Sequence, residues 1–215
     1  MSYWETRYAL GGTSGVGSVG EARKWKWNVI TEVISTLDHV IDVGCGDLTF
    51  WEGRDCKDYV GIDISKTITD KNKLDHPKWS FINAPAERYI EGLKNECVIC
   101  LDVLFHIIDS VSFIQILDNL CRYSTSLIFI HTWIDNPFGR WKQLKHGLHN
   151  LMKLRLNRAI TALRIAIFTP YKDGSYQYFR SLEQYMDIFE RNGFKLLDKR
   201  EKPDKYGCLY IFKAS

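Results

Sequence analysis

Short runs of apolar residues recur along the chain and are separated by segments with helical spacing. The runs rich in Val, Ile and Phe predict seven strands, at residues 39–43, 58–62, 78–82, 96–101, 126–131, 194–200 and 208–214. Because helix-like segments alternate with most of these runs, we expect an α/β fold, a doubly wound, mostly parallel sheet with helices on both faces. Only the turn-like sequence EKPDKYG separates the last two runs, so they should form an antiparallel hairpin at one edge.

The composition is typical of a globular protein with one core. The chain has 215 residues, 45% of them hydrophobic, and we predict a single domain over residues 1–215. No apolar run reaches the length of about eighteen residues that a membrane span needs, and no secretion-signal pattern is present. We therefore expect a soluble, cytoplasmic protein whose six cysteines are reduced, buried thiols. Cys97 and Cys100 form a C-x-x-C pair without a second pair at zinc-site spacing.

Residues 15–20 read GVGSVG, which matches the glycine fingerprint of a dinucleotide-binding turn. Such a turn needs a buried strand that runs into its first glycine. The preceding residues instead carry Glu5 and Arg7 among aromatics, which is not the pattern of a buried strand. We predict that residues 1–37 form a glycine-rich cap and a helix, with Ser18 as the helix N-cap.

A second glycine pair does have the required strand. An apolar run leads directly into Gly44 and Gly46, so the backbone can turn tightly and approach a ligand. Nineteen residues after Gly44, Asp63 ends the next strand, where a carboxylate can accept both ribose hydroxyls of an adenosine. Asp42 and Asp47 would repel a pyrophosphate bound at the N-terminus of the helix expected after Gly46, and would attract an ammonium or sulfonium group. S-adenosylmethionine carries both of these cations and no phosphate.

At these residues the sequence resembles the class I S-adenosylmethionine-dependent methyltransferases. The resemblance covers most of the chain and rests on four motifs, VIDVGCGD, VGIDIS, FINAPAE and ECVICLDVLFHI. It implies the strand order 3-2-1-4-5-7-6 with the seventh strand antiparallel. It also implies that Gly44 and Gly46 line the methionine end of S-adenosylmethionine, that Asp63 binds its ribose, and that the segment after the third strand flanks its adenine. The cofactor-binding residues that we predict are Arg7, Ser14, Ser18, Asp42, Gly44, Gly46, Asp63, Ile64, Ala86, Glu87, Asp102 and Val103.

Two residues depart from the family pattern. Leu48 stands where many members have glycine. Pro85 stands in the place of an acidic residue that bonds the adenine amino group, which leaves Ala86 and Glu87 as the candidates for adenine contact.

The opening residues resemble N-terminal segments of methyltransferases encoded with polysaccharide or glycan biosynthesis functions, where the loop closes over cofactor and acceptor. By that resemblance Tyr3, Trp4, Arg7, Ser14 and Ser18 are candidates for contact with the cofactor's carboxylate or methyl group. Aromatic faces near a sulfonium also attract it through cation–π interaction. The alternative is that these aromatics only pin the N-terminus to the core.

Methyl transfer to a hydroxyl requires a base that accepts the hydroxyl proton near neutral pH. His106 follows the fourth predicted strand and His131 ends the fifth, and ligands of such sheets bind beyond these strand ends. Related methyltransferases often have a histidine at the position of His106. We predict His106, His131 and Asp102 as catalytic residues, with Asp102 or Asp109 orienting the histidine that acts.

A metal-assisted alternative uses Asp102 together with Asp135 and Asn136, which faintly resemble the magnesium ligands of catechol-type methyltransferases. Because the Asp-Asn pair lies several residues beyond the fifth strand, we predict no metal.

Residues 134–180 are strongly basic. They contain nine Lys and Arg and two Asp, a net charge of +7, whereas the whole chain carries +3, so the remainder is at −4. Leu and Met recur there at helical spacing, and we predict a basic helical lid on the acceptor side of the site. A phosphate, an acidic sugar or an anionic membrane surface would complement this charge, whereas the alternative is a solvated helix face. No nucleic-acid-binding module is recognisable, so nucleic acid is not the partner we predict.

Together these patterns predict a methyltransferase that uses S-adenosylmethionine to methylate a sugar hydroxyl of a glycan or glycoconjugate. A lipid-linked or phosphorylated acceptor and peripheral contact with the inner membrane face are compatible with the basic segment. A small-molecule or lipid methyltransferase is one alternative. A non-catalytic cofactor-binding scaffold is another, which the departures at Leu48 and Pro85 keep open.

Overall fold

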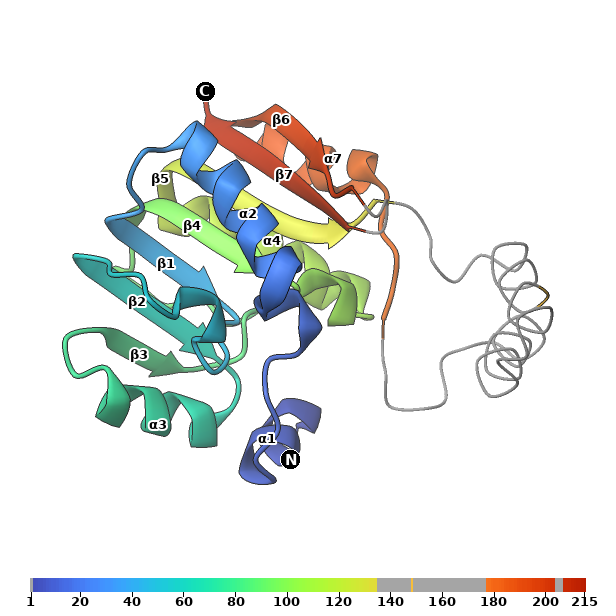
Figure 1. Ribbon diagram of the computed structural model, residues 1–215. Coiled ribbons are helices and arrows are strands. Elements are labelled where there is room, and N and C mark those ends of the chain that lie inside the picture. The colour runs from blue at the N-terminus through green and yellow to red at the C-terminus, as the bar shows by residue number, and fades with distance from the viewer. Residues whose placement is uncertain (1, 135–147, 149–176, 204–206) are drawn as a thin grey trace.

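The computed structural model describes residues 2–134, 148, 177–203 and 207–215. Within them, seven strands form one sheet in the order β3-β2-β1-β4-β5-β7-β6 (Figure 1). Neighbouring strands are parallel from β3 to β5, and β7 is antiparallel to both β5 and β6. The predicted α/β fold, strand order and edge hairpin are thus confirmed. The strands are β1 (His39–Val43), β2 (Asp58–Asp63), β3 (Ser80–Asn83), β4 (Asn95–Leu101), β5 (Ser124–Trp133), β6 (Phe194–Glu201) and β7 (Gly207–Ala214).

The helices of the described residues cover the sheet and its strand ends. They are α1 (Tyr3–Ala9), α2 (Gly20–Val33), α3 (Lys66–Asp75), α4 (Ser110–Tyr123) and α7 (Leu182–Arg191). Three short 3-10 turns occur at Val16–Ser18, Thr49–Trp51 and Leu104–His106. Each of these described helices is too short or too polar to cross a lipid bilayer. Most of the predicted basic lid, including Asp135 and Asn136, lies outside the described residues.

Two local predictions are wrong. Ser18 is not the N-cap of α2, because it closes a 3-10 turn through the bond from its N–H to the Gly15 carbonyl (3.2 Å), and Val19 takes the cap position without a side-chain bond. The helix expected after Gly46 is replaced by the turn Thr49–Trp51. Leu48 adopts a left-handed conformation with φ 60°, which a right-handed helix does not accommodate.

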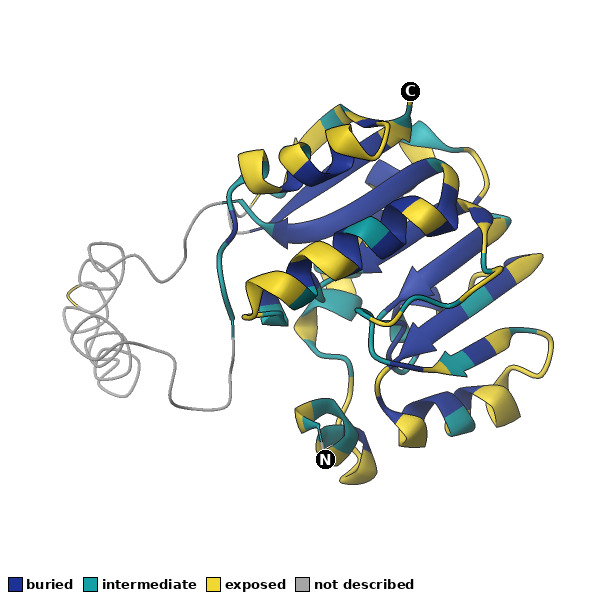
Figure 2. Cartoon of the chain, turned by 180° about the vertical axis from the view of Figure 1, so that it is seen from behind, coloured by how far each residue is buried: buried dark blue, intermediate teal, exposed yellow. Residues whose placement is uncertain are grey.

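Alternating residues along the strands build a core on each face of the sheet. On one face α2 contributes Trp27 and Ile30, which join the aromatic side chains of Trp51 and Tyr59. On the other face α4 and α7 bury Leu117, Phe189 and their apolar neighbours. Figure 1 shows α2 in front of the sheet, and Figure 2 shows the opposite face with the buried sides of its helices turned toward the strands.

All six cysteines are free and buried, as predicted. Cys97 and Cys100 are three positions apart in β4, so their side chains point to opposite faces of the sheet. Cys97 packs in the core on the α2 face and Cys100 in the core on the α4 face. The two thiols therefore cannot share a metal ion or form a disulfide in this strand.

Candidate active site

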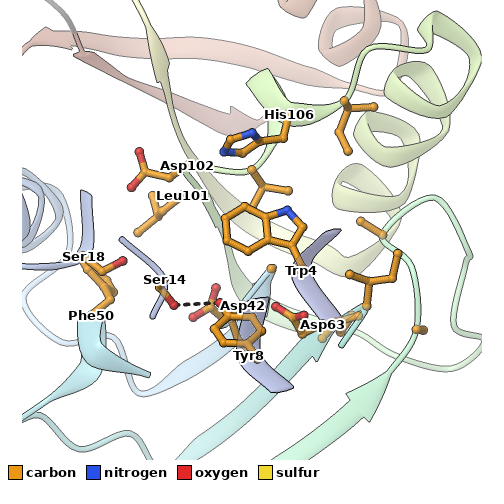
Figure 3. A pocket seen from close by; sticks show the side chains of 18 of the residues that line it. Trp4, Tyr8, Ser14, Ser18, Asp42, Phe50, Asp63, Leu101, Asp102 and His106 are labelled. Atoms are coloured by element: carbon orange, nitrogen blue, oxygen red, sulfur yellow. Dashed lines mark hydrogen bonds between the residues drawn. The ribbon is translucent and has the colours of Figure 1, made fainter. Parts of the chain in front are cut away.

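A cavity of about 190 Å³ lies at the carboxyl ends of β1, β2 and β4, large enough for a small molecule or several waters (Figure 3). Its walls come from the N-terminal segment, α2, the turn after β1, and the segments that follow β2, β3 and β4. The residues that line it are Trp4, Tyr8, Ser14, Ser18, Lys26, Asp42, Gly44, Cys45, Phe50, Ile62, Asp63, Ile64, Ala84, Ala86, Glu87, Leu101, Asp102, Val103, His106 and Ile107.

Most of the residues predicted for the site line this cavity, but Tyr3, Arg7, Gly46, Asp109 and His131 do not. The predicted residues present are Ser14, Ser18, Asp42, Gly44, Asp63, Ile64, Ala86, Glu87, Asp102, Val103 and His106. Arg7 is turned to its own segment, where its guanidinium donates to the Thr13 carbonyl (2.6 Å) and the Tyr3 hydroxyl (3.1 Å). Gly46 packs against Ser14, and His131 contacts Asp102, and both of these partners line the cavity.

The two glycines after β1 are needed for close packing. Gly44 has φ +83°, and a Cβ there would lie 2.2 Å from a methyl of Val103. At Gly46 a Cβ would lie 2.2 Å from the hydroxyl oxygen of Ser14. These positions let the β1 turn contact both the segment after β4 and the N-terminal cap, which no side chain would allow.

The N-terminal segment is fastened over the cavity by hydrogen bonds. The Ser14 N–H and hydroxyl donate to the two carboxylate oxygens of Asp47 (2.9 and 2.7 Å). Glu5 in α1 accepts from the hydroxyls of Ser65 (2.5 Å) and Thr67 (2.6 Å) at the start of α3. Trp4 then lies between Tyr8 and His106, at ring-centroid distances of 6.0 and 5.2 Å (Figure 3).

Two buried carboxylates stand on the β1 and β2 side of the cavity. Asp63 accepts from the backbone N–H groups of Gly46 (3.0 Å) and Ser65 (2.9 Å), and burial raises its pKa. Asp42 accepts from the indole N–H of Trp51 (2.8 Å) and the hydroxyl of Tyr59 (3.0 Å). Burial raises the pKa of Asp42 to about 6. Negative charge in this wall therefore favours a cationic ligand.

The segment after β3 supplies a further wall. Asn119 of α4 donates its amide to the carbonyls of Ala86 (3.0 Å) and Glu87 (2.9 Å). Both of these residues line the cavity although Pro85 precedes them. Because Asn119 of α4 holds the backbone of Ala86 and Glu87, the position of this segment does not depend on an acidic residue at position 85.

A buried ion pair in the cavity wall was not predicted. The Lys26 ammonium, from α2, contacts the Asp102 carboxylate and donates to the Gly17 carbonyl (3.0 Å). Lys26 is 1% exposed. Burial lowers the pKa of Lys26, which Asp102 opposes. The sequence does carry a signal, because Lys26 lies three and four positions before the buried Val29 and Ile30 on one helix face.

Asp102 also holds His131. Its second carboxylate oxygen lies 2.5 Å from His131 Nδ1, and its backbone has φ +63°. Burial alone would raise the pKa of Asp102, but His131 and Lys26 together lower it well below its usual range. Burial lowers the pKa of His131, so the neutral ring donates Nδ1–H to Asp102. His131 Nε2 is buried against Gly207, away from the cavity.

Among the described residues, no three His, Cys, Asp or Glu side chains gather in a metal-binding group. Asp135 and Asn136, the other two residues of the metal alternative, lie outside that part of the chain.

Comparison with known proteins rests on structure. No family model matches the chain, and no curated protein matches it. Magnesium protoporphyrin IX methyltransferase (ChlM) from Synechocystis, crystallised with S-adenosylhomocysteine, is 17% identical with a TM-score of 0.63 over 98% of this chain and 94% of that chain. The protein has the fold of the class I methyltransferases. This methyltransferase fold is shared by two further solved structures. An S-adenosylmethionine-dependent methyltransferase from Clostridium acetobutylicum is 11% identical, with a TM-score of 0.60 over 91% of this chain and 93% of that chain. The N-methyltransferase NodS from Bradyrhizobium japonicum is 12% identical, with a TM-score of 0.57 over 89% of this chain and 95% of that chain.

Proposed function

We propose that this protein is an S-adenosylmethionine-dependent methyltransferase. The observation that carries the proposal is the cavity at the strand ends of a methyltransferase fold, in which Asp42, Asp63 and Glu87 supply carboxylates. A phosphate-bearing cofactor would meet these negative charges, whereas a ligand with ammonium and sulfonium groups is attracted by them. Gly44 fits the same ligand because it lines the cavity without a side chain, and Gly46 leaves room for Ser14.

The residues present fit three parts of S-adenosylmethionine, the ribose, the adenine and the ammonium. Asp63 would accept the ribose hydroxyls, because each carboxylate oxygen that binds a backbone N–H keeps a further lone pair. Ala86 and Glu87 would flank the adenine, and Asp42 would face the ammonium of the methionine end. The bound cofactor supplies an electrophilic methyl group on a positively charged sulfur, which keeps the bonding electron pair when the methyl group leaves.

The described residues also provide a base for an oxygen acceptor. His106 lines the cavity next to Trp4, whereas His131 reaches it only through Asp102. We therefore assign proton removal from the acceptor hydroxyl to His106, which contributes about 10²–10⁴-fold in rate for such a base. Asp102 and His131 position the cavity wall beside it.

The acceptor that the sequence predicts, a sugar hydroxyl of a glycan or glycoconjugate, remains a proposal. It is supported by the +7 charge of residues 134–180, which suits a phosphorylated or acidic sugar, and by the N-terminal aromatics, of which Trp4 lines the cavity. A lipid or another small molecule is the alternative acceptor. Contact of the basic segment with an anionic membrane likewise remains a prediction.

Calorimetric titration with S-adenosylmethionine and S-adenosylhomocysteine tests the function. We expect micromolar binding of both ligands to the wild-type protein, and at least tenfold weaker binding to Asp63→Ala, because a hydrogen bond to a charged group contributes about 1.5–3 kcal/mol. Asp187→Ala, an exposed position on α7, is the control and should bind as the wild type does. Failure of the wild-type protein to bind either ligand would overturn the proposal and favour a scaffold role.

A further inference from the structure

Lys26 presents an unused hydrogen-bond donor to the cavity. An ammonium has three N–H groups, and two of them meet the Gly17 carbonyl and the Asp102 carboxylate. Within the part of the chain that the structure describes, the third has no protein acceptor, and the side chain lines the cavity. Because Lys26 lines the cavity, a ligand bound there is the acceptor that we consider for this N–H.

The position of Lys26 divides the cavity by charge. It is the one Lys or Arg among the described lining residues, and it sits beside Asp102 at the carboxyl end of β4. Asp42 and Asp63 stand at the ends of β1 and β2. In Figure 3, Asp102 and His106 lie on one side of Trp4 and Asp63 lies on the other. The cationic ligand is therefore drawn to one side, which leaves the side with Lys26 and His106 for the acceptor.

We propose that Lys26 donates its third N–H to the acceptor's reacting oxygen, and that the acceptor is the small-molecule alternative to a sugar, with an ionisable hydroxyl such as a phenol or an enol. The proposal rests on the proposed function and names the acceptor class of the same site. The hydroxyl proton passes to His106, and the oxygen keeps the electron pair with which it forms the bond to the methyl carbon. An ammonium held in a water-poor site stabilises the negative charge that develops on this oxygen. It would repel the protonated form of an amine acceptor.

Two contacts hold this ammonium in place, and the Asp102 carboxylate opposes the lowering of its pKa by burial. Asp102 stays ionised because His131 and Lys26 both stabilise its carboxylate, and it holds the ammonium from one side. The Gly17 carbonyl holds it from another, and a Cβ on Gly17 would lie 2.3 Å from Asp102 Oδ2. The Gly17 loop thus packs directly on the ion pair.

The probe that tests the proposal is 4-nitrophenol, whose visible absorbance distinguishes the phenol from the phenolate. We would titrate it with pH in the presence of the wild-type protein saturated with S-adenosylhomocysteine. A cation at hydrogen-bond distance should lower the pKa of the bound phenol by about one unit or more. Bound probe that titrates at or above the pKa of the free probe, or a titration curve that the protein does not change, would overturn the proposal without recourse to a variant.

Variants then assign the shift to Lys26. Lys26→Met and Lys26→Gln should return the pKa of the bound probe to within about 0.3 units of the free value, since neither carries the charge. Lys24→Met, exposed on the same helix, should keep the wild-type shift. Melting temperature and S-adenosylhomocysteine affinity confirm that each variant is folded. A shift that persists in a folded Lys26 variant refutes the role of Lys26 alone, whereas absence of S-adenosylhomocysteine binding to the wild type refutes the proposed function.

Discussion

Replacement of Asp42 by Asn tests whether the ionised Asp42 carboxylate lowers the free energy of unfolding of the ligand-free protein. Asp42 is 5% exposed, and burial raises its pKa from an ordinary value of 3.8 to about 6. A carboxyl that binds its proton more tightly in the folded state stabilises the fold below its unfolded pKa, and this contribution is lost as the pH rises through the folded pKa. The shift of about two units corresponds to about 3 kcal/mol, lost between about pH 4 and about pH 6.

Asn cannot ionise, so the variant does not lose stability as the pH rises, and its amide oxygen can still accept hydrogen bonds from Trp51 and Tyr59. Asp42→Asn should therefore be more stable than the wild type by up to about 3 kcal/mol near pH 7.5, and the difference should vanish below about pH 4. Urea denaturation of the ligand-free proteins across this range measures it. Asp187→Asn is the exposed control and should show no such gain. A difference that does not change with pH, or a variant that is less stable near pH 7.5, would refute the reasoning.

Ligand binding should respond in the opposite direction. A cation beside Asp42 stabilises the ionised carboxylate, so S-adenosylmethionine should bind more weakly as the pH falls through about 6. Asp42→Asn should lose most of this pH dependence and bind more weakly at neutral pH. Calorimetry at several pH values measures both effects, and equal pH dependence in the two proteins would contradict a contact between Asp42 and the ligand's cation.

Three further substitutions test the other walls of the cavity. Gly46→Ala should weaken S-adenosylhomocysteine binding at least tenfold in calorimetry, because its Cβ would displace Ser14. Gly92→Ala, also at a positive φ but with open space around it, should lose stability alone. Glu5→Gln should speed limited proteolysis of the N-terminal segment several-fold without a change in the sheet's thermal transition, since it weakens the hydrogen bonds to the start of α3. His106→Asn should lower turnover by about 10²–10⁴-fold while S-adenosylhomocysteine affinity stays within about threefold, and wild-type turnover would exclude His106 as the base.

The sheet and the location of the site could be predicted because both depend on local patterns. The apolar runs fix the strands to within about two residues, and an apolar strand that ends in glycine marks the turn at Gly44. What could not be predicted depends on contacts between distant segments. The spacing of Lys26 from Val29 and Ile30 places it on the buried face of a helix, but its partner Asp102 is 76 positions away in the sequence. His131 was expected at a strand tip, whereas β5 continues to Trp133 and leaves the histidine inside the strand.

The difference in charge between the two sides of the cavity explains how one site can place the cofactor on one side and the acceptor on the other. On the β4 side the charges of Lys26 and Asp102 cancel, so that side is polar but nearly neutral. On the β1 and β2 side Asp42 and Asp63 have no described cationic partner, and the raised pKa of each shows that its ionised form is unfavourable in the ligand-free protein. A cation bound there relieves this penalty, whereas the β4 side offers the same cation no net negative charge. The direction in which a sulfonium ligand binds is therefore set by this asymmetry of charge, and the contacts of any single residue are secondary to it.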